Sequence, residues 1–309
     1  MPHHDLVVLG DCNPDLLLCG DVVPRFGQAE QLLDEAVLTI GGSGAIVATG
    51  AARLGLDVAL IAVVGDDALG RIQIEALRAR SVDVGGVIMD PVVPTGLSVI
   101  LSRGEDRAIL TRPGAVGALR AELVDRELLR SARHVHISSY FLQVTLHAGL
   151  PELLRDARDA GATVSLDTNW DPSGGWDGGV GALLPLVDCL LPNEEEARRI
   201  TKTNSATAAA AALAAQVPTV AIKLGAAGAL ARSGDAMAES VAPLIQVVDT
   251  TGAGDSFNAG FLVGRLRGWD LDACLELAVA CGSLSARALG VEGQPSLEEA
   301  ERTVRAAAR

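Results

Sequence analysis

The sequence predicts an α/β fold, a three-layer αβα sandwich in which helices cover both faces of a mainly parallel central sheet. Short apolar runs alternate with helical patterns along most of the chain. Runs that are apolar at every position are typical of parallel strands buried on both faces. The predicted strands are 6–10, 58–64, 134–137, 163–167, 187–191 and 219–223, and the predicted helices are 45–54, 69–80, 146–160, 194–201 and 207–215.

Two segments do not follow this alternation. Residues 15–40 are rich in turn formers, and residues 95–111 have the pattern of a hairpin with a charged tip. We expect both segments to project from the sheet and to form a small β-sheet lid. The sequence has no internal repeat and no linker long enough to divide it, so we expect one domain over residues 1–309.

Composition and charge narrow the possible functions. The 309 residues carry 39 acidic and 25 basic side chains, a formal net charge of −14. This balance argues against nucleic acid or an anionic membrane as the main partner, because both require basic surface. The 5 cysteines have no metal-binding spacing, as is typical of a reducing compartment. Without a signal-peptide pattern or an apolar run of membrane length, the expected location is the cytoplasm.

The most informative stretch is the glycine-rich sequence DTTGAGDSF at residues 249–257. The apolar run 243–248 predicts a strand before it, and residues 258–265 predict a buried helix after it. A glycine-rich turn at a helix N-terminus exposes backbone N–H groups that can bind an anion. The alternative is an ordinary helix start capped by Thr250 or Thr251.

An acidic residue within this turn favours phosphoryl transfer over simple phosphate binding. The amides of Gly252, Ala253 and Gly254 are suited to hold the phosphoryl group. Asp255 would repel a stored phosphate, but it is well placed to take a proton from an attacking hydroxyl. The alternative function of Asp255 is a favourable interaction with the helix dipole.

Two further motifs predict a pocket for a hydroxylated ligand. Asn13 and Asp15 follow the first strand, and in parallel α/β sheets this position lines the binding crevice. Their side chains can donate to and accept from sugar hydroxyls, although an Asn-Pro-Asp turn explains them equally well. Gly41, Gly42 and Ser43 open the next helix, where glycines permit close approach of a ligand to the backbone.

Later motifs are suited to a nucleotide and its metal. Asn193 and Glu196 have the spacing of a capping box, which alone explains helix initiation. The functional alternative is that Glu196 holds a water molecule on Mg²⁺. Lys223 can face phosphates as a point charge, and Gly225 and Gly228 would let the backbone pass beside a nucleotide, although a tight hairpin also explains them.

In this order, the motifs resemble the PfkB/ribokinase family of carbohydrate kinases over nearly the whole chain. Residues 41–55 match its first signature, residues 249–260 match its second, and Asn193 with Glu196 matches its Asn-x-x-Glu magnesium motif. The resemblance implies a ribokinase-like fold. It also implies transfer of the γ-phosphate of ATP to a hydroxyl of a sugar or sugar-like substrate.

The resemblance also implies a role for each matching residue. Asp255 corresponds to the catalytic base, and the 252–254 amides to the anion hole. Substrate-contacting positions are Asn13, Asp15, Gly41, Gly42, Ser43 and Ile46; nucleotide-contacting positions are Asn193, Lys223, Gly225, Gly228 and Gly254; and Glu196 corresponds to the Mg²⁺ residue, acting through water. Asp249 and Thr251 correspond to candidates for a monovalent cation such as K⁺, with carbonyls near Ser285, Ala288 and Gly290.

One position departs from the family pattern. Ile46 stands where the first signature usually has an asparagine that contacts the substrate. Isoleucine forms no side-chain hydrogen bond, so a buried sugar hydroxyl left unpaired there would cost ~1 kcal/mol or more. Ile46 therefore favours a less hydroxylated substrate, such as a deoxy sugar or a nucleoside, and Tyr140 and Phe141 could supply a stacking face.

Three functions remain open from the sequence. The first is a sugar kinase, the second a nucleoside (adenosine-like) kinase of the same fold, and the third a ligand-binding regulator without catalysis. The presence of Asp255 and Glu196 favours an enzyme. Exposed strand edges in the lid would allow a homodimer.

Overall fold

The computed structural model of the chain describes residues 4–103 and 106–307, and its main feature is a nine-stranded sheet. The strand order is β13-β12-β11-β10-β9-β8-β1-β4-β5. Neighbours from β11 to β5 are parallel, whereas β12 and β13 are antiparallel. The bounds are β1 His4–Leu9, β4 Val58–Gly65, β5 Val82–Asp90, β8 Ala132–Ile137, β9 Thr163–Leu166, β10 Cys189–Leu190, β11 Thr219–Lys223, β12 Ala229–Ser233 and β13 Ala236–Ser240.

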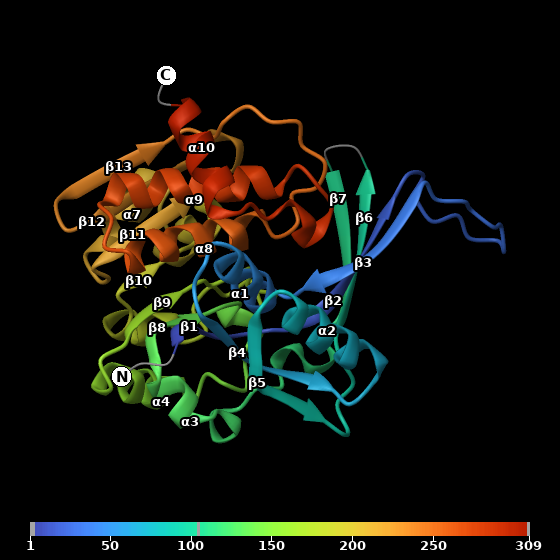
Figure 1. Cartoon of the computed structure of the whole chain (residues 1–309), viewed down its shortest axis with the longest axis horizontal. Coiled ribbons are helices and arrows are strands. Elements are labelled where there is room, and N and C mark those ends of the chain that lie inside the picture. The colour runs from blue at the N-terminus through green and yellow to red at the C-terminus, as the bar shows by residue number, and fades with distance from the viewer. Residues whose placement is uncertain (1–3, 104–105, 308–309) are drawn as a thin grey trace.

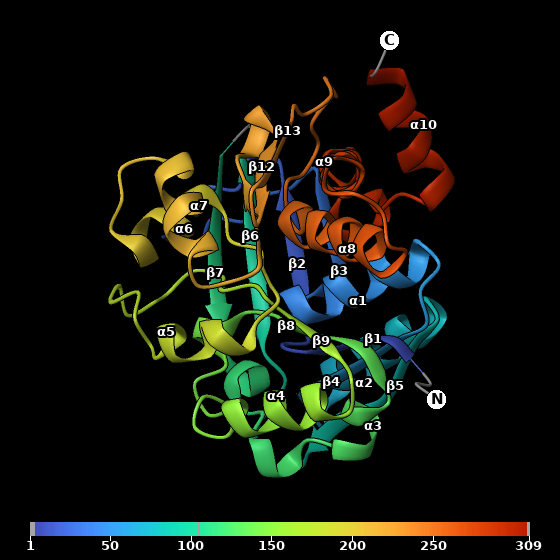
Figure 2. The same cartoon turned by 90° about the vertical axis from the view of Figure 1, so that its left-hand side faces the viewer.

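Helices cover both faces of the large sheet, which confirms the predicted three layers (Figure 2). Alternate residues of β1 point to opposite faces, with Leu6 and Val8 in one apolar core and Val7 and Leu9 in the other. One face carries α1 Ser43–Arg53, α2 Ala68–Ala79, α8 Ala253–Leu266, α9 Leu271–Ser285 and α10 Leu297–Ala307. The other carries α3 Arg126–Arg130, α4 Leu150–Asp159, α5 Val180–Leu183, α6 Glu194–Thr201 and α7 Ala206–Ala214.

A second sheet of four strands, in the order β3-β2-β6-β7, stands beside the large one (Figure 1). Its strands are β2 Asn13–Cys19, β3 Glu35–Gly41, β6 Leu97–Arg103 and β7 Asp106–Arg112. They come from the two segments that interrupt the predicted alternation, and the connection between β2 and β3 projects away from the molecule (Figure 1). Gly104 and Glu105, at the tip of the predicted hairpin, lie outside the described residues.

The parallel strands place several polar residues at one edge of the large sheet. Asp11 follows β1, Ser139 follows β8, Asp167 follows β9, and Lys223 is the last residue of β11. Asn13 begins β2, so the small sheet starts from this same edge. In open α/β sheets this carboxyl edge is where ligands bind.

The predicted strand at 243–248 is wrong, because this run has no regular secondary structure. Pro243 lacks the N–H that a sheet would need, and Leu244 is fully exposed. The apolar residues of this run instead line a hollow beside α8. Within the described ranges, no helix combines the length and apolar character needed to cross a bilayer.

Candidate active site

The glycine-rich turn leads directly into α8. Its N-cap is Gly252, in the left-handed conformation with a φ of 71°, and no side chain caps the helix. The alternative in which Thr250 or Thr251 caps the helix is therefore wrong. Both threonine hydroxyls instead accept hydrogen bonds from Nη1 of Arg107 on β7, at 3.0 and 3.2 Å.

Most N–H groups at the start of α8 are available to a ligand. The Ala253 N–H donates to the carbonyl of Thr250 at 3.2 Å. Those of Gly252, Gly254 and Asp255 have no protein acceptor among residues 4–103 and 106–307. The backbone N–H groups available to an anion are thus those of residues 252, 254 and 255. The sequence predicted residues 252–254, but the N–H of residue 253 is already bound within the turn.

Asp255 lies in the first turn of α8 and is only 9% exposed. Burial, followed by the nearby Asp167, raises its pKa well above the ordinary value, and the charge of Lys223 opposes this rise. The side chain of Ser43 also lowers the pKa of Asp255. A carboxylate with a raised pKa is a stronger proton acceptor, as a general base requires.

Asn13 and Asp15 lie together at the start of β2 and are both buried. Nδ2 of Asn13 donates to Oδ1 of Asp15 at 3.2 Å. Burial and then Asp11 raise the pKa of Asp15 to about 7, while a hydrogen bond with Ser98 lowers it. A Cβ on Gly41 would come within 2.2 Å of the Asp15 carboxyl, so only glycine leaves room for this carboxylate.

Asp11 was not among the predicted site residues, although it follows β1 at the same edge. Its Oδ1 accepts the N–H of Gly44 at 3.0 Å, and burial raises its pKa. Gly42 has a φ of 81°, and a Cβ there would lie 2.9 Å from the Asp11 carbonyl oxygen. Asp11 therefore holds the first turn of α1 against β1.

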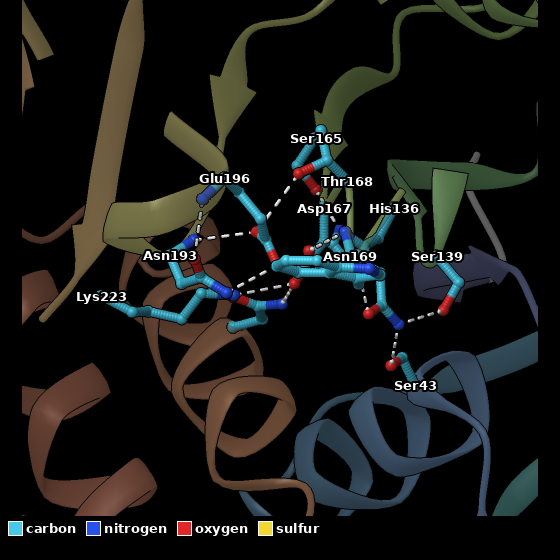
Figure 3. Close-up of polar contacts among 12 residues, drawn as sticks. Ser43, His136, Ser139, Ser165, Asp167, Thr168, Asn169, Asn193, Glu196 and Lys223 are labelled. Atoms are coloured by element: carbon cyan, nitrogen blue, oxygen red, sulfur yellow. Dashed lines mark hydrogen bonds and ion pairs between the residues drawn. The ribbon is translucent and has the colours of Figure 1, made fainter. Parts of the chain in front are cut away.

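Ser43, the first residue of α1, connects this helix to two strand ends. Nδ2 of Asn169 donates to Oγ of Ser43 at 3.2 Å and to Oγ of Ser139 at 3.0 Å (Figure 3). Because Asn169 follows β9 and Ser139 follows β8, the contact ties the substrate-side helix to the sheet edge.

The predicted capping box of α6 is confirmed, and its glutamate also faces the site. The Asn193 N–H donates to Oε2 of Glu196 at 2.9 Å, and the Glu196 N–H donates to Oδ1 of Asn193 at 2.9 Å. Thr168 donates to the same Oε2 at 3.2 Å (Figure 3). Burial and then Asp167 raise the pKa of Glu196 to about 7.

Lys223 sits between the carboxylates of the site (Figure 3). Its Nζ lies 2.8 Å from Oδ2 of Asp167 and donates to Oδ1 of Asn258 at 3.2 Å. Asn258 also donates to Asp167, and a Cβ on Gly254 would lie 3.6 Å from the Lys223 Nζ. Asp167 and Asn258, neither of which was predicted, thus position the cation beside the glycine-rich turn.

Two adjoining hollows share Lys223, Gly225, Thr250 and Gly254. The larger, of about 570 Å³, is lined mostly by polar residue types and includes these predicted residues: Asn13, Asp15, Gly42, Ser43, Ile46, Asn193, Glu196, Lys223, Gly225, Thr251, Gly252, Gly254 and Asp255. The second, of about 350 Å³, is mainly apolar and includes Gly228, Ala253, Pro243, Leu244, Ile245, Phe257 and Val279. Gly41 and Asp249 line neither.

Ile46 lines the polar hollow from α1 and packs close to the turn. A Cβ on Gly252 would come within 2.9 Å of Cγ2 of Ile46. The apolar side chain therefore stands at the glycine-rich turn, where a substrate would have to approach Asp255.

Asp249 is held by the turn and by the segment after α9. Its Oδ1 accepts the N–H of Thr251 at 2.9 Å and the Thr251 hydroxyl at 2.7 Å, and its Oδ2 accepts the N–H of Gly290 at 2.9 Å. Asp249, Thr251 and Gly290, three of the positions proposed for a monovalent cation, thus lie together, and the Asp249 carboxylate is already bound to protein donors.

Tyr140 and Phe141 do not supply the suggested stacking face. They are 1% and 4% exposed and belong to the core between the sheet and its second helix layer. Tyr140 stacks on His147, and Phe141 packs edge-on against Trp176. Leu142 alone of this segment lines the polar hollow.

Comparison with known proteins identifies the family of this chain. The family model for the pfkB family carbohydrate kinases matches residues 3–298. This chain belongs to the pfkB family of carbohydrate kinases. It is 32% identical to a ribokinase of Arabidopsis thaliana, with 92% of this chain and 76% of the relative covered.

Solved structures give the same result for the fold. An E. coli protein described as a putative ribokinase II in complex with ATP and Mg²⁺ superposes with a TM-score of 0.88 at 25% identity, covering 98% of this chain and 99% of that one. The adenosine kinase of Sinorhizobium meliloti gives a TM-score of 0.85 at 25% identity, covering 98% and 99%. This chain is therefore a phosphotransferase that acts on a hydroxyl acceptor, with a ribokinase-like fold.

Proposed function

We propose that this pfkB kinase transfers the γ-phosphate of ATP to a hydroxyl of a sugar or sugar-like small molecule, with Asp255 as the catalytic base. The observation that carries the proposal is the position of Asp255. It lines the polar hollow from the first turn of α8, beside unpaired amides and next to Gly254, which both hollows share.

The apolar hollow is suited to the base of the nucleotide. Pro243, Leu244, Ile245 and Val279 form walls of hydrocarbon, as flat aromatic ligands prefer. Lys223 and the start of α8 lie where the two hollows join, so a triphosphate would extend from the apolar hollow toward Asp255. The likeness to a protein solved in complex with ATP and Mg²⁺ supports ATP as the nucleotide.

The site fits a magnesium ion. Asp167, Glu196 and Asp255 lie around Lys223. Burial and then Asp167 raise the pKa of Glu196 and of Asp255, and the charge of Lys223 opposes both shifts. Within the described residues there is no cluster of protein ligands that would enclose a metal, as expected for an ion that keeps water and binds phosphate. Glu196 would hold one of these waters, and Mg²⁺ when bound neutralises charge on the phosphate oxygens.

The protein groups define the transfer step. Asp255 accepts the proton of the substrate hydroxyl as the hydroxyl oxygen attacks the γ-phosphorus in line, the bond from the γ-phosphorus to the bridging β-phosphate oxygen breaks, and ADP leaves. The amides of Gly252, Gly254 and Asp255 hold the equatorial oxygens of the phosphoryl group. The four-stranded sheet contributes Ser98, Ile100 and Ile109 to the polar hollow, and we propose that it acts as a lid that excludes water.

The second part of the proposal concerns which class of molecule accepts the phosphate. Ile46 supports a substrate with fewer hydroxyls than ribose, because it offers no hydrogen bond beside the turn. A nucleoside is the second candidate, supported also by the likeness to an adenosine kinase. A regulator without catalysis is the third, although intact Asp255 and Glu196 weigh against it.

The test is ADP release from Mg-ATP across a panel of pentoses, hexoses, keto-deoxy acids and nucleosides. We expect one acceptor class to be turned over, and Asp255→Asn to lower kcat by about 10²–10⁴-fold with little change in KM. Asp235→Asn is the matched control, because Asp235 is exposed on the β12–β13 turn. Parallel assays in potassium and sodium salts test the proposed monovalent cation near Asp249 and Thr251.

Near-normal turnover by Asp255→Asn would rule out its role as the base. ATP binding without ADP release on any acceptor would favour the regulator. Turnover of nucleosides alone would select the second candidate over a sugar kinase.

A further inference from the structure

A second polar hollow lies at the opposite edge of the large sheet, where strands β8 and β9 begin. It has a volume of about 570 Å³, and we name it the arginine hollow after Arg130, Arg133 and Arg265, which line it together with Thr163. No carboxylate is among its lining residues in the described part of the chain. In a protein with a net charge of −14, it is unusual that all the charged residues lining this hollow are arginines.

Two of the three arginines are held in place by carboxylates. Nε and Nη2 of Arg130 lie 2.9 and 2.7 Å from Oδ1 of Asp156. Nη1 of Arg133 lies 2.6 Å from Oδ1 of Asp5, and its Nη2 donates to the carbonyl of Leu266 at 3.0 Å. These contacts fix both guanidinium groups at the rim and leave each with further N–H donors.

The third arginine has no such neighbour. Arg265 is exposed in the last turn of α8, and within residues 4–103 and 106–307 it has neither a hydrogen bond nor an ion pair. A free guanidinium beside two fixed ones provides what a phosphate group prefers, planar donors and positive charge. The carbonyl dipoles at the end of α8 oppose an anion, but Arg133 already neutralises the carbonyl of Leu266.

We propose that the arginine hollow binds the phosphate group of a small phosphorylated molecule. The hollow, of about 570 Å³, could hold many water molecules, because one water occupies about 30 Å³ in the liquid. It is therefore much larger than a phosphate ion. The hollow therefore has room for an organic ester beside the phosphate. The site is separate from the glycine-rich turn, because α8 places Asp255 in its first turn and Arg265 in its last.

The test measures the dissociation constants of two probes, inorganic phosphate and glycerol 3-phosphate, by calorimetry at constant ionic strength. Titrations with and without saturating Mg-AMPPNP separate this site from anions bound at the glycine-rich turn. The variant is Arg265→Ala, and the control is Arg302→Ala, another exposed arginine that does not line the hollow.

We expect Arg265→Ala to weaken binding of both probes about tenfold or more, as for loss of a charge-assisted contact. Arg302→Ala should bind both as the unmodified protein does, and tighter binding of glycerol 3-phosphate would identify the ester as the preferred form. Equal affinity in Arg265→Ala, or no binding of either probe beyond that of chloride, would overturn the proposal. Neither result depends on whether the kinase acts on sugars or nucleosides.

Discussion

Carboxyl groups on the substrate side of the site are buried at a cost in stability. Asp15 is 5% exposed, and burial with the neighbouring Asp11 raises its pKa to about 7 from an ordinary value near 3.8. A carboxyl whose folded pKa is raised favours the folded state when protonated, and this contribution is lost as the pH rises through the folded pKa. Asp15 should therefore destabilise the protein most above pH 7.

We expect Asp15→Asn to become more stable relative to the unmodified protein as the pH rises. Between pH 5 and pH 8 the difference in free energy of unfolding should grow by about 3 kcal/mol in favour of the variant. Urea denaturation at intervals of one pH unit measures it, and Asp235→Asn should show no such trend. A difference independent of pH would mean that Asp15 titrates normally in the folded state.

The free energy of unfolding of Asp15→Asn must be compared with that of the unmodified protein, because other titratable groups change the stability in the opposite direction as the pH rises. Burial lowers the pKa of His134 to about 3 and of His136 to about 4. A histidine with a lowered pKa stabilises the fold above its unfolded pKa and loses this contribution as the pH falls. The pH curve of the unmodified protein therefore combines opposing slopes, which subtraction removes.

Residue patterns predicted Asp255 and the Asn193–Glu196 pair because local chemistry defines them, a glycine-rich helix start and a capping box. Asp11, Asp167 and Asn258 gave no such local signal. Their importance arises from contacts across the fold, such as that of Lys223 with Asp167, 56 residues apart. The rule that residues after parallel strands line the site would have identified Asp11 and Asp167, but not Asn258 inside α8.

At the scale of elements, strand β7 joins the small sheet to the glycine-rich turn. Arg107 on β7 donates to the hydroxyls of Thr250 and Thr251 and lines the polar hollow. These threonines directly precede the amides proposed to hold the phosphoryl group. The contact therefore connects the proposed lid to the proposed anion hole through one guanidinium.

We expect Arg107→Ala to lower kcat at least tenfold, because an arginine beside a transferring phosphoryl group stabilises its charge. Loss of the lid contact should also raise the ADP formed without acceptor relative to that formed with it. Arg103→Ala, an exposed arginine at the end of β6, is the control for charge on the same sheet. Steady-state assays with and without acceptor measure both effects, and equal behaviour of the two variants would contradict the connection.

The large parallel sheet was predictable because its buried strands are apolar throughout. Elements that are only partly covered by protein, such as edge strands and pocket walls, were not predictable in this way. Strand β5 contains Gly85 and Gly86 and is paired on one side only, so its apolar pattern is broken. The run 243–248 is apolar for another reason, since it lines the second hollow and does not enter the sheet. An apolar run therefore need not be a buried strand, because the wall of an open hollow can also be apolar.

At the scale of the whole molecule, the open edges of the small sheet indicate how the protein assembles. Strands β3 and β7 form the two edges of the small sheet, each paired on one side only among the described residues. Leu38 on β3 and Leu110 on β7 are 44% and 60% exposed. Phe26, in the projecting β2–β3 connection, is 98% exposed. Open strand edges with exposed apolar side chains favour pairing with another chain.

We expect a homodimer formed through this small sheet. Leu38→Lys with Leu110→Lys should halve the mass measured by light scattering during gel filtration, since each lysine places a charge at an edge. Met237→Lys, at a 55% exposed position on the edge strand β13 of the large sheet, should leave the mass unchanged. If β3 and β7 form the interface, the double variant should also raise the KM for the acceptor, because the proposed lid would lose its support. A monomer at every concentration of the unmodified protein would refute the dimer, and a dimer that survives the double variant would exclude this sheet as its interface.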